Sequence, residues 1–336
     1  MSNEDLIKEL PTLVSLKGLG ETTVQKLNAH GINNIIDLSV ANAVDVARLM
    51  NKSTDAAMAL VLDARGILRK CGRAGSSVMN IEDLHEREKM KKVISTTVPQ
   101  LDSILGGGIH TMEITEFYGE FGSGKSQICF TMAVLATRPE EEGGLGGNVL
   151  YIDTEGTLTS ERMIEIINER KLDPATIRKI HRMRPESSGL FELDIENISE
   201  TIVSNEIKMV VVDSIIHLHR QEYPGRENLP VRQQKLAKIM NKLLKVAESY
   251  NIAIIITNQI IDDPGVNPLF GGSPIHATGG NVIAHASTTR LYIDKLKSRM
   301  KVKVMDSPKL EGAEGYFTIG KKGIEEYKDK ITKPAN

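Results

Sequence analysis

The segment GEFGSGKS, at residues 119–126, has the spacing of glycine, lysine and serine that binds nucleotide phosphates. Gly122 and Gly124 let successive backbone N–H groups turn toward phosphate oxygens. Lys125 brings a charge to the β- and γ-phosphates, and the Ser126 hydroxyl is a Mg²⁺ ligand. A strand pattern before the segment and a helix pattern after it favour this function over a turn without a ligand. The predicted contacts to ATP and Mg²⁺ are Gly119, Glu120, Phe121, Gly122, Ser123, Gly124, Lys125 and Ser126.

Polar residues follow three further apolar segments, at places where parallel strands end. Asp213 ends KMVVVD and is expected to hold Mg²⁺, with a helix N-cap as the alternative. The segment YIDTEG offers Asp153 and Glu155 on one face, so the spacing does not decide which one orients an attacking water. Asn258 and Gln259 follow IAIIIT, where an amide is a candidate γ-phosphate sensor. A simple strand-end hydrogen bond fits that pattern equally well.

Three arginines at intervals of six residues follow Asp213. They are Arg220, Arg226 and Arg232, in a segment that begins like a buried strand and ends like a helix. The formal net charge is −2, so contact with nucleic acid must come from local basic patches. From the charge pattern alone, the segment is either a phosphate-binding loop or a solvated surface loop.

The chemistry-bearing segments require a scaffold, and an alternation of strand and helix patterns from about residue 99 onward predicts one. Continuous apolar strands separated by helices indicate an α/β fold whose mainly parallel sheet is flanked by helices. The C-terminal segments TTRLYIDKL, KVKVMDS and GYFTIGKKGI have patterns typical of β-hairpin additions. The predicted strands are 113–119, 148–153, 207–213 and 252–259, and the predicted helices are 125–137, 161–170, 190–206 and 231–250.

The chain divides into three parts by composition. Residues 1–72 have the pattern of short helices joined by tight turns, with Ser39 and Ser53 as candidate N-caps. Residues 73–98 are small and charged, as in a partly helical linker. Residues 99–336 form the predicted α/β domain.

The overall composition is that of an ordinary globular protein, with 40% hydrophobic and 26% charged residues. No apolar run reaches the ~18 residues that a membrane span needs, and the acidic start MSNEDLIKEL is not a secretory signal. The two cysteines form no disulfide or metal pattern, which favours a reducing cytoplasm. Tryptophan is absent and aromatics make up 4%, which argues against a broad base-stacking platform.

Taken together, the motifs resemble those of the RecA/Rad/Dmc family of DNA strand-exchange ATPases, and within it the archaeal RadA recombinases. The matching segments extend over nearly the whole chain and include LKGLGETTVQKL, TTVPQLDSILGGGI, DTEGT, EYPGRENLPVRQQKL and HASTTRLYI. The resemblance implies a RecA-like P-loop ATPase core and an N-terminal helix-hairpin-helix DNA-binding domain. It further implies that Glu155 activates the attacking water, beside Lys125, and that Gln259 couples the γ-phosphate to a DNA-binding loop.

The resemblance also implies the partners. Single-stranded and double-stranded DNA would contact loop one, after Asp213, and loop two, at about 260–280. Asp306, in the segment MDSP, would contact the nucleotide of a neighbouring subunit in a helical filament or ring. Recombination mediator proteins are further expected partners, in a cytoplasmic, nucleoid-associated location. The implied DNA contacts are Arg220, Arg226, Arg232, Gly279 and Gly280.

Several positions depart from the family pattern. Val78 and Ile81 stand where the family has the phenylalanine and alanine of its polymerisation motif, so the joint between subunits is expected to be repacked or weak. Thr159 replaces an arginine near the base, and Asn281 replaces a histidine. A strand-exchange recombinase is the leading functional hypothesis. The alternative is a recombinase paralogue or mediator that exchanges strands poorly, and a third is a P-loop kinase or small-molecule ATPase.

Overall fold

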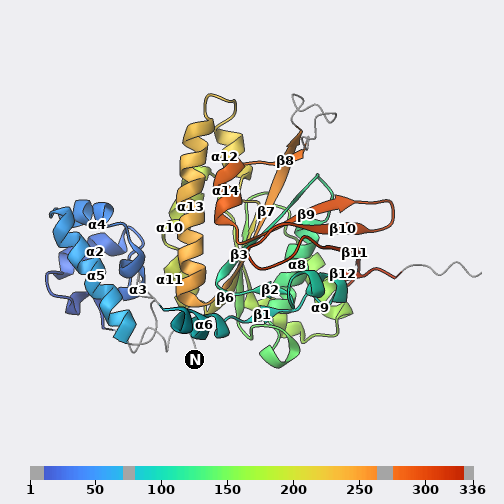
Figure 1. Ribbon diagram of the computed structural model, residues 1–336, viewed down its shortest axis with the longest axis horizontal. Coiled ribbons are helices and arrows are strands. Elements are labelled where there is room, and N and C mark those ends of the chain that lie inside the picture. The colour runs from blue at the N-terminus through green and yellow to red at the C-terminus, as the bar shows by residue number, and fades with distance from the viewer. Residues whose placement is uncertain (1–10, 71–79, 263–274, 329–336) are drawn as a thin grey trace, which may run out of the picture.

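The computed structural model describes residues 11–70, 80–262 and 275–328 of the 336-residue chain. Figure 1 shows a group of short helices at one end and, beside it, a larger part built around a central sheet. Within the described residues, no helix is both long enough and apolar enough to cross a membrane.

The central sheet has the strand order β12-β11-β10-β9-β3-β7-β6-β4-β5, with β8 paired to β7 outside this path. The strands from β9 to β5 in this order are parallel, and β10, β11 and β12 add an antiparallel meander. The predicted α/β class with a mainly parallel sheet is confirmed. The bounds are β3 (Glu113–Gly119), β4 (Asn148–Asp153), β5 (Ile180–Met183), β6 (Ile207–Asp213), β7 (Ala253–Asp262), β8 (Ile275–Ala277), β9 (Thr289–Lys295), β10 (Met300–Asp306), β11 (Glu314–Gly320) and β12 (Gly323–Glu326).

Hydrophobic cores lie on both faces of the sheet, because alternate residues of each strand point to opposite faces. In β4, Val149 and Tyr151 join the core under α8 and α9, whereas Leu150 and Ile152 join the core under α10, α11 and α13. This two-sided burial explains the continuous apolar strands of the sequence. The helices are α7 (Pro99–Ile104), α8 (Lys125–Ala136), α9 (Ser160–Glu169), α10 (Ser188–Glu196), α11 (Ile198–Ser204), α12 (His217–Glu222), α13 (Leu229–Tyr250) and α14 (Gly280–Ala286), with the short η2 (Glu140–Glu142) and η3 (Pro174–Lys179).

One helix predicted at 190–206 is two helices, which meet at Asn197. The Asn197 side chain donates to the Leu193 carbonyl oxygen at 3.0 Å, and its backbone has φ −94° and ψ 5°. Such a local side-chain bond competes with continuation of the helix. The prediction of a single helix was therefore wrong.

The N-terminal helices pack against the sheet domain and share a hydrophobic cluster with it. Ser53 accepts a hydrogen bond from Ala56 N at 3.3 Å, as an N-cap does. Ser39 was wrongly predicted as an N-cap: it lies inside a helix and donates to the Ile36 carbonyl oxygen at 2.7 Å. Asn34 and Asn42 cap the two helices instead. The elements are η1 (Leu13–Ser15), α2 (Glu21–Asn28), α3 (Ile35–Val40), α4 (Ala43–Met50) and α5 (Thr54–Lys70).

The connection between the two parts contains α6 (Ile81–Lys89) and β1 (Val93–Ile94), which pairs with β2 (Ile109–His110). Ile81 begins α6 with 78% of its surface exposed. Val78 lies outside the described residues. The division at residues 72 and 98 stays a prediction.

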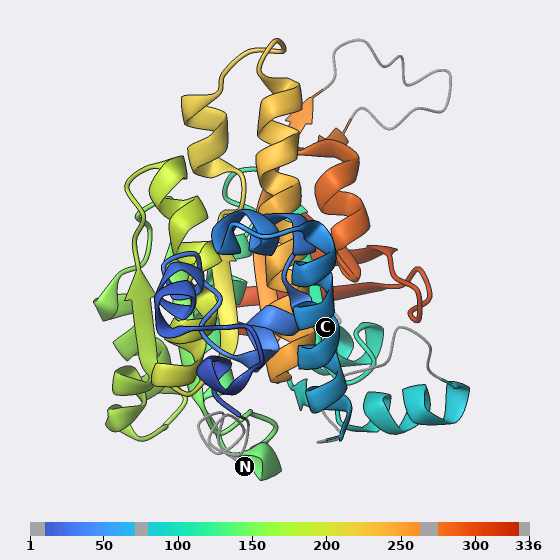
Figure 2. The ribbon, with the colours of Figure 1, turned by 90° about the vertical axis from the view of Figure 1, so that its left-hand side faces the viewer.

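The connection from α12 to α13 and the outer ends of β7 and β8 project from the same end of the molecule in two perpendicular views (Figures 1 and 2). They carry the predicted loops one and two. The sheet thus brings both loops to the edge at which the parallel strands end.

Candidate functional site

The phosphate loop joins β3 to α8, as the sequence predicts. Gly124 stands directly before α8 with a φ of 97°, a left-handed conformation that glycine adopts without the steric cost of a side chain. A Cβ on Gly119 would lie 2.3 Å from the Ile293 carbonyl oxygen, so the end of the strand also requires glycine. The loop therefore places the N-terminal turn of α8 in the wall of a pocket, where helix N–H groups favour anions.

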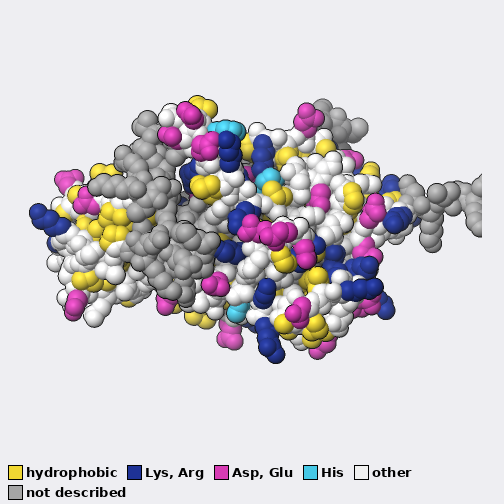
Figure 3. Space-filling view, turned by 90° about the horizontal axis from the view of Figure 1, so that it is seen from below, with side chains coloured by type: hydrophobic (Ala, Val, Ile, Leu, Met, Phe, Trp, Pro, Cys, Tyr) yellow, Lys and Arg dark blue, Asp and Glu magenta, His cyan; other side chains and the backbone are white. Residues whose placement is uncertain are grey.

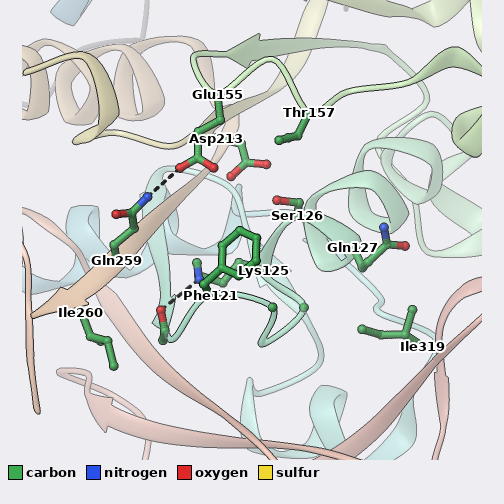
Figure 4. A pocket seen from close by; sticks show the side chains of 13 residues that line it. Phe121, Lys125, Ser126, Gln127, Glu155, Thr157, Asp213, Gln259, Ile260 and Ile319 are labelled. Atoms are coloured by element: carbon green, nitrogen blue, oxygen red, sulfur yellow. Dashed lines mark hydrogen bonds between the residues drawn. The ribbon is translucent and has the colours of Figure 1, made fainter. Parts of the chain in front are cut away.

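This pocket has a volume of about 380 Å³, within the range typical of cofactor sites (Figure 4). Parallel strands β3, β4, β6 and β7 end around it, and β11 closes one side with Ile319. Ser123 Oγ is buried nearby without a hydrogen-bond partner within the described residues. The pocket is lined by Gly119, Phe121, Gly122, Gly124, Lys125, Ser126, Gln127, Glu155, Thr157, Asp213, Gln259, Ile260 and Ile319.

Lys125 folds back on the phosphate loop. Its Nζ donates to the carbonyl oxygens of Gly119 at 2.9 Å and Glu120 at 2.8 Å. Burial holds the pKa of Lys125 below its ordinary value, and the carboxylates of Glu155 and Asp213 act in the opposite direction. A phosphate group in the pocket would offer this partly desolvated cation a charged acceptor in place of two neutral carbonyls.

Asp213 lies at the end of β6 and is almost fully buried. Its carboxylate accepts hydrogen bonds from Thr257 Oγ1 at 2.5 Å and Tyr151 Oη at 2.8 Å. Burial raises the pKa of Asp213, while hydrogen bonds from Thr257, Tyr151 and Ser126 act to lower it. The Ser126 hydroxyl and this carboxylate thus lie together, as the sequence predicts.

The donor set fits Mg²⁺ bound together with a nucleotide. Within the described part of the chain, no cluster of three or more histidine, cysteine, aspartate or glutamate residues can hold a metal. Mg²⁺ commonly takes one or two protein oxygens and completes its shell with phosphate oxygens and water. Ser126 and Asp213 supply that number and leave the remaining positions to the ligand.

The structure distinguishes the two carboxylates that the spacing left open. Asp153 is buried away from the pocket and accepts from Arg182 Nη2 at 2.5 Å and from the Thr157 backbone N–H at 3.0 Å. Glu155 lies beyond the end of the strand, lines the pocket and is partly exposed. Asp153 therefore braces the turn, and Glu155 is the carboxylate available to a water.

The two amides at the end of β7 also have different surroundings. Asn258 is buried and donates to Glu116 Oε1 at 2.8 Å and to the Thr278 carbonyl oxygen at 2.7 Å. Gln259 faces the pocket and donates through Nε2 to Glu155 Oε1 at 3.0 Å (Figure 4). The candidate sensor and the candidate base are thus direct neighbours.

The three arginines predicted for loop one differ in how firmly they are held. Arg220, in α12, is exposed and donates from Nη1 to Gln259 Oε1 at 3.3 Å. Arg226 is exposed in the connection to α13. Arg232 is half-buried, and its Nη1 donates to the Tyr223 carbonyl oxygen at 2.7 Å. They lie in residues 217–232, a segment that we call the arm and that begins beside the pocket.

Loop two was predicted at about 260–280, but the described residues at both of its ends form strands. β7 continues to Asp262 and pairs antiparallel with β8, with Ile260 opposite Ala277, so backbone groups at the two ends pair with each other. Gly279 and Gly280 follow β8 at the start of α14, both with positive φ. Their predicted contact with a phosphate stays a prediction.

Two further predicted positions lie away from the pocket of their own chain. Asp306 ends β10 on an exposed surface, opposite Arg290 of β9. Thr159 precedes α9, where Arg162 donates to Gln127 Oε1 at 3.0 Å and to the Gly320 carbonyl oxygen at 2.6 Å.

Sequence reasoning missed several residues that build the site. Tyr151 and Thr257 hold Asp213 from the two neighbouring strands, and Arg182 neutralises Asp153. Tyr151 lies two residues before Asp153, and Thr257 lies two residues before Gln259. Because residues two apart in a strand share a face, this spacing was an available signal. Ile319 gave no signal, because it reaches the pocket only through the C-terminal meander.

A glycine-rich strand–loop–helix segment, carboxylates at the ends of parallel strands and this strand order define a P-loop protein with a RecA-like core. The family model described as Rad51 matches residues 86–327, so the chain belongs to the Rad51 family. The chain is 38% identical over 321 residues to the DNA repair and recombination protein RadA of Cenarchaeum symbiosum, covering 95% of this chain and 80% of that protein. It is 37% identical over 326 residues to the protein of the same name from Methanoculleus marisnigri, covering 93% and 98% respectively.

Proposed function

We propose that this protein is an ATP-dependent DNA strand-exchange recombinase. It polymerises on single-stranded DNA and promotes homologous pairing with double-stranded DNA in recombination and repair. The observation that carries the proposal is the position of Gln259, which lines the phosphate pocket and touches both Glu155 and Arg220. The names of the two RadA relatives support the same biological role.

The pocket residues have separate roles in ATP hydrolysis. Mg²⁺, held by Ser126 and Asp213, would neutralise phosphate charge when bound. Lys125 leaves the two loop carbonyls for the β- and γ-phosphates. Glu155 orients the attacking water and accepts its proton, because it is the partly exposed carboxylate of the pocket. Gln259, which is hydrogen-bonded to Glu155, senses the γ-phosphate through its side-chain amide.

DNA binds through backbone phosphates at loops one and two. Figure 3 shows the face opposite the end at which these loops project, and in its described part lysine and arginine side chains are interspersed with acidic ones. Arg220, Arg226 and Arg232 lie together in one arm, followed in the chain by the strands of loop two. Contacts of this kind carry no base information, so binding is independent of sequence and weakens with salt.

Polymerisation uses the free edge of the sheet. β5 ends the strand order, and a hollow of about 450 Å³ lies beside it. The linker segment that contains Val78 and Ile81 of one subunit would occupy this hollow on the next. Asp306, exposed at the end of β10, would approach the nucleotide of a neighbouring subunit. Apolar residues that line the hollow are Leu158, Met163, Ile177 and Ile180.

The first test is ATP hydrolysis by the purified protein with and without single-stranded DNA, repeated with Arg226→Ala. We expect DNA to stimulate hydrolysis strongly. Arg226→Ala should lose most of this stimulation, because Arg226 is exposed and lies outside the pocket, so its removal weakens the contact with DNA and leaves the site of hydrolysis intact. Hydrolysis of the wild-type protein that is indifferent to DNA would contradict the proposed function.

A recombinase paralogue or mediator is the alternative, favoured by the altered linker residues Val78 and Ile81. It binds ATP and DNA but exchanges strands poorly. An assay of homologous pairing between single-stranded DNA and a matched duplex separates the two functions, with a duplex of unrelated sequence as the control. Pairing that depends on homology supports the recombinase, which would act in the cytoplasm on the nucleoid and with recombination mediators.

A further inference from the structure

A chain of two side-chain hydrogen bonds joins the nucleotide pocket to loop one. Gln259 Nε2 donates to Glu155 Oε1 at 3.0 Å, and Arg220 Nη1 donates to Gln259 Oε1 at 3.3 Å. Both ends of the amide are matched, since its oxygen faces a cation and its NH₂ group faces a carboxylate. Figure 4 shows the Gln259 side chain directed at Glu155, its neighbour in the pocket, with the hydrogen bond between them drawn.

The backbone that carries Gln259 is fixed from the opposite side. Asn258 Oδ1 accepts from the Gln259 backbone N–H at 2.8 Å, and Asn258 Nδ2 donates to Glu116 and to the Thr278 carbonyl. Glu116 is fully buried and accepts from Arg290 Nε at 2.6 Å. The Gln259 side chain can therefore change partner without breaking this buried network.

The hydrogen-bonded arrangement occupies the groups that hydrolysis needs. One oxygen of Glu155 accepts from the Gln259 amide, which fixes the orientation of the carboxylate and reduces its strength as an acceptor for a water. The amide of Gln259 is engaged at both ends and is not directed at a γ-phosphate. Arg220 supplies the outer bond, and it does so from an exposed position in α12, a helix at the start of the DNA-binding arm.

A DNA phosphate is a stronger partner for Arg220 than the oxygen of Gln259. The present bond is long, and its acceptor is neutral. A phosphate is charged and accepts two parallel N–H bonds from a guanidinium, which makes the exchange favourable. Arg220 can thus leave the amide when DNA occupies loop one.

We propose that Arg220 is a positioning residue that holds Gln259 and Glu155 in a resting arrangement until DNA captures its guanidinium. This inference rests on the proposed function and adds a cause for its dependence on DNA. Without DNA, Arg220 keeps the amide on Glu155. With DNA, Gln259 turns toward the γ-phosphate and Glu155 accepts from the attacking water.

The test compares Arg220→Ala, Arg220→Lys and the wild-type protein in steady-state ATP hydrolysis, with and without saturating single-stranded DNA. We expect Arg220→Ala to raise the DNA-free kcat by about three- to tenfold, the effect of one weak hydrogen bond. Its KM for ATP stays unchanged, because Arg220 does not line the pocket. The stimulation by DNA falls by the same factor. Arg220→Lys keeps a cationic donor and gives an intermediate rate.

Lys328→Ala is the control, since Lys328 is a largely exposed cation after β12, outside the pocket, outside loop one and outside the hollow beside β5. We expect wild-type rates from it. If the wild-type protein is stimulated by DNA but the DNA-free rate of Arg220→Ala equals or falls below the wild-type rate, this inference is overturned and the proposed function stands. If wild-type hydrolysis ignores DNA, both are overturned.

Discussion

The nucleotide pocket and the loop-one arm lie side by side, yet their charged groups are held in opposite ways. Asp213 lines the pocket and Glu116 lies behind it in β3, as part of what we call the wall; both are buried and each accepts hydrogen bonds from neighbouring strands. In the arm, Arg220 and Arg226 are exposed, and the Arg220 side chain has one long hydrogen bond to an amide. Hydrolysis needs a fixed geometry, whereas binding to an irregular phosphate backbone needs charge that can adjust.

The contrast also shows where the two regions can communicate. The pocket wall cannot rearrange without leaving buried polar groups unpaired, which costs free energy. The arm can rearrange freely but lies outside the pocket. Gln259 has one hydrogen-bond partner in each region, and His217 of α12 lies 4.0 Å from Glu155 Oε1 beside it. The variants below therefore change the wall, the pocket or the arm one at a time, so that the difference between the regions can be tested.

The largest effect is expected from Glu116→Ala, which removes the acceptor of a buried wall network. Arg290 then loses its carboxylate and Asn258 loses an acceptor, both in places with little access to water. We expect the free energy of unfolding to fall by about 3–5 kcal/mol. Denaturant unfolding measures the change.

The double variant Glu116→Leu with Arg290→Met provides the control for that experiment. It removes both charges together, so no uncompensated buried charge remains, and we expect most of the lost free energy of unfolding to return. An equal loss in the single and double variants would mean that the pair contributes only by packing.

Lys125→Ala is expected to have the next largest effect and to act on chemistry without a loss of stability. The present partners of Lys125 Nζ are two carbonyl oxygens of its own loop. Loss of a cation directed at developing phosphate charge lowers kcat by about 10²–10³-fold. ATP hydrolysis and thermal unfolding, measured on the same preparation, separate the two outcomes. Lys321→Ala, at a largely exposed lysine, is the control and should keep wild-type values for both.

The comparison also explains what the sequence could predict. The four central strands and the phosphate loop depend on local patterns, namely continuous apolar runs and a glycine-lysine spacing, and the structure contains them at the expected places. The choice between Asp153 and Glu155 was not predictable from spacing, because Arg182 reaches Asp153 from β5, which is distant in sequence. The contact of Arg220 with Gln259 was not predictable either, since it joins α12 to β7 through tertiary packing.

The errors in the predicted helices and strands also come from contacts that the local sequence pattern does not contain. Ser39 has the residue type of an N-cap, but Asn34 and Asn42 start the helices that pack there. The break between α10 and α11 at Asn197 follows from one side-chain hydrogen bond, which the spacing of apolar residues does not reveal. The end of β7 at residues 260–262 pairs with β8, beyond the part of β7 that pairs with β3 and β6, so the apolar pattern of the central sheet did not mark it.

The smallest expected effect is a pH-dependent change in the free energy of unfolding, which arises where the arm packs against the rest of the protein. His219, in α12, is fully buried, and its Nε2 lies 3.2 Å from Glu192 Oε1 of α10. Burial holds the pKa of His219 below 6.5, assisted by Lys235 and opposed by Glu192. Because the folded pKa is depressed, the unfolded chain binds a proton first as the pH falls below 6.5. The contribution of His219 to the free energy of unfolding is therefore fully present above pH 6.5 and is lost as the pH falls below it.

The replacement His219→Phe tests this pH dependence, because a phenyl ring can pack against Phe191 and Tyr223 without titrating. Denaturant unfolding between pH 5 and 8 should show a fall in the free energy of unfolding below pH 6.5 in the wild-type protein, and none of that component in the variant. His85→Phe, at an exposed histidine in α6, should keep the wild-type profile. A His219→Phe profile identical to that of the wild type would show that another group produces the pH dependence, and the ion pair of Glu192 with Lys235 would then be the next to remove.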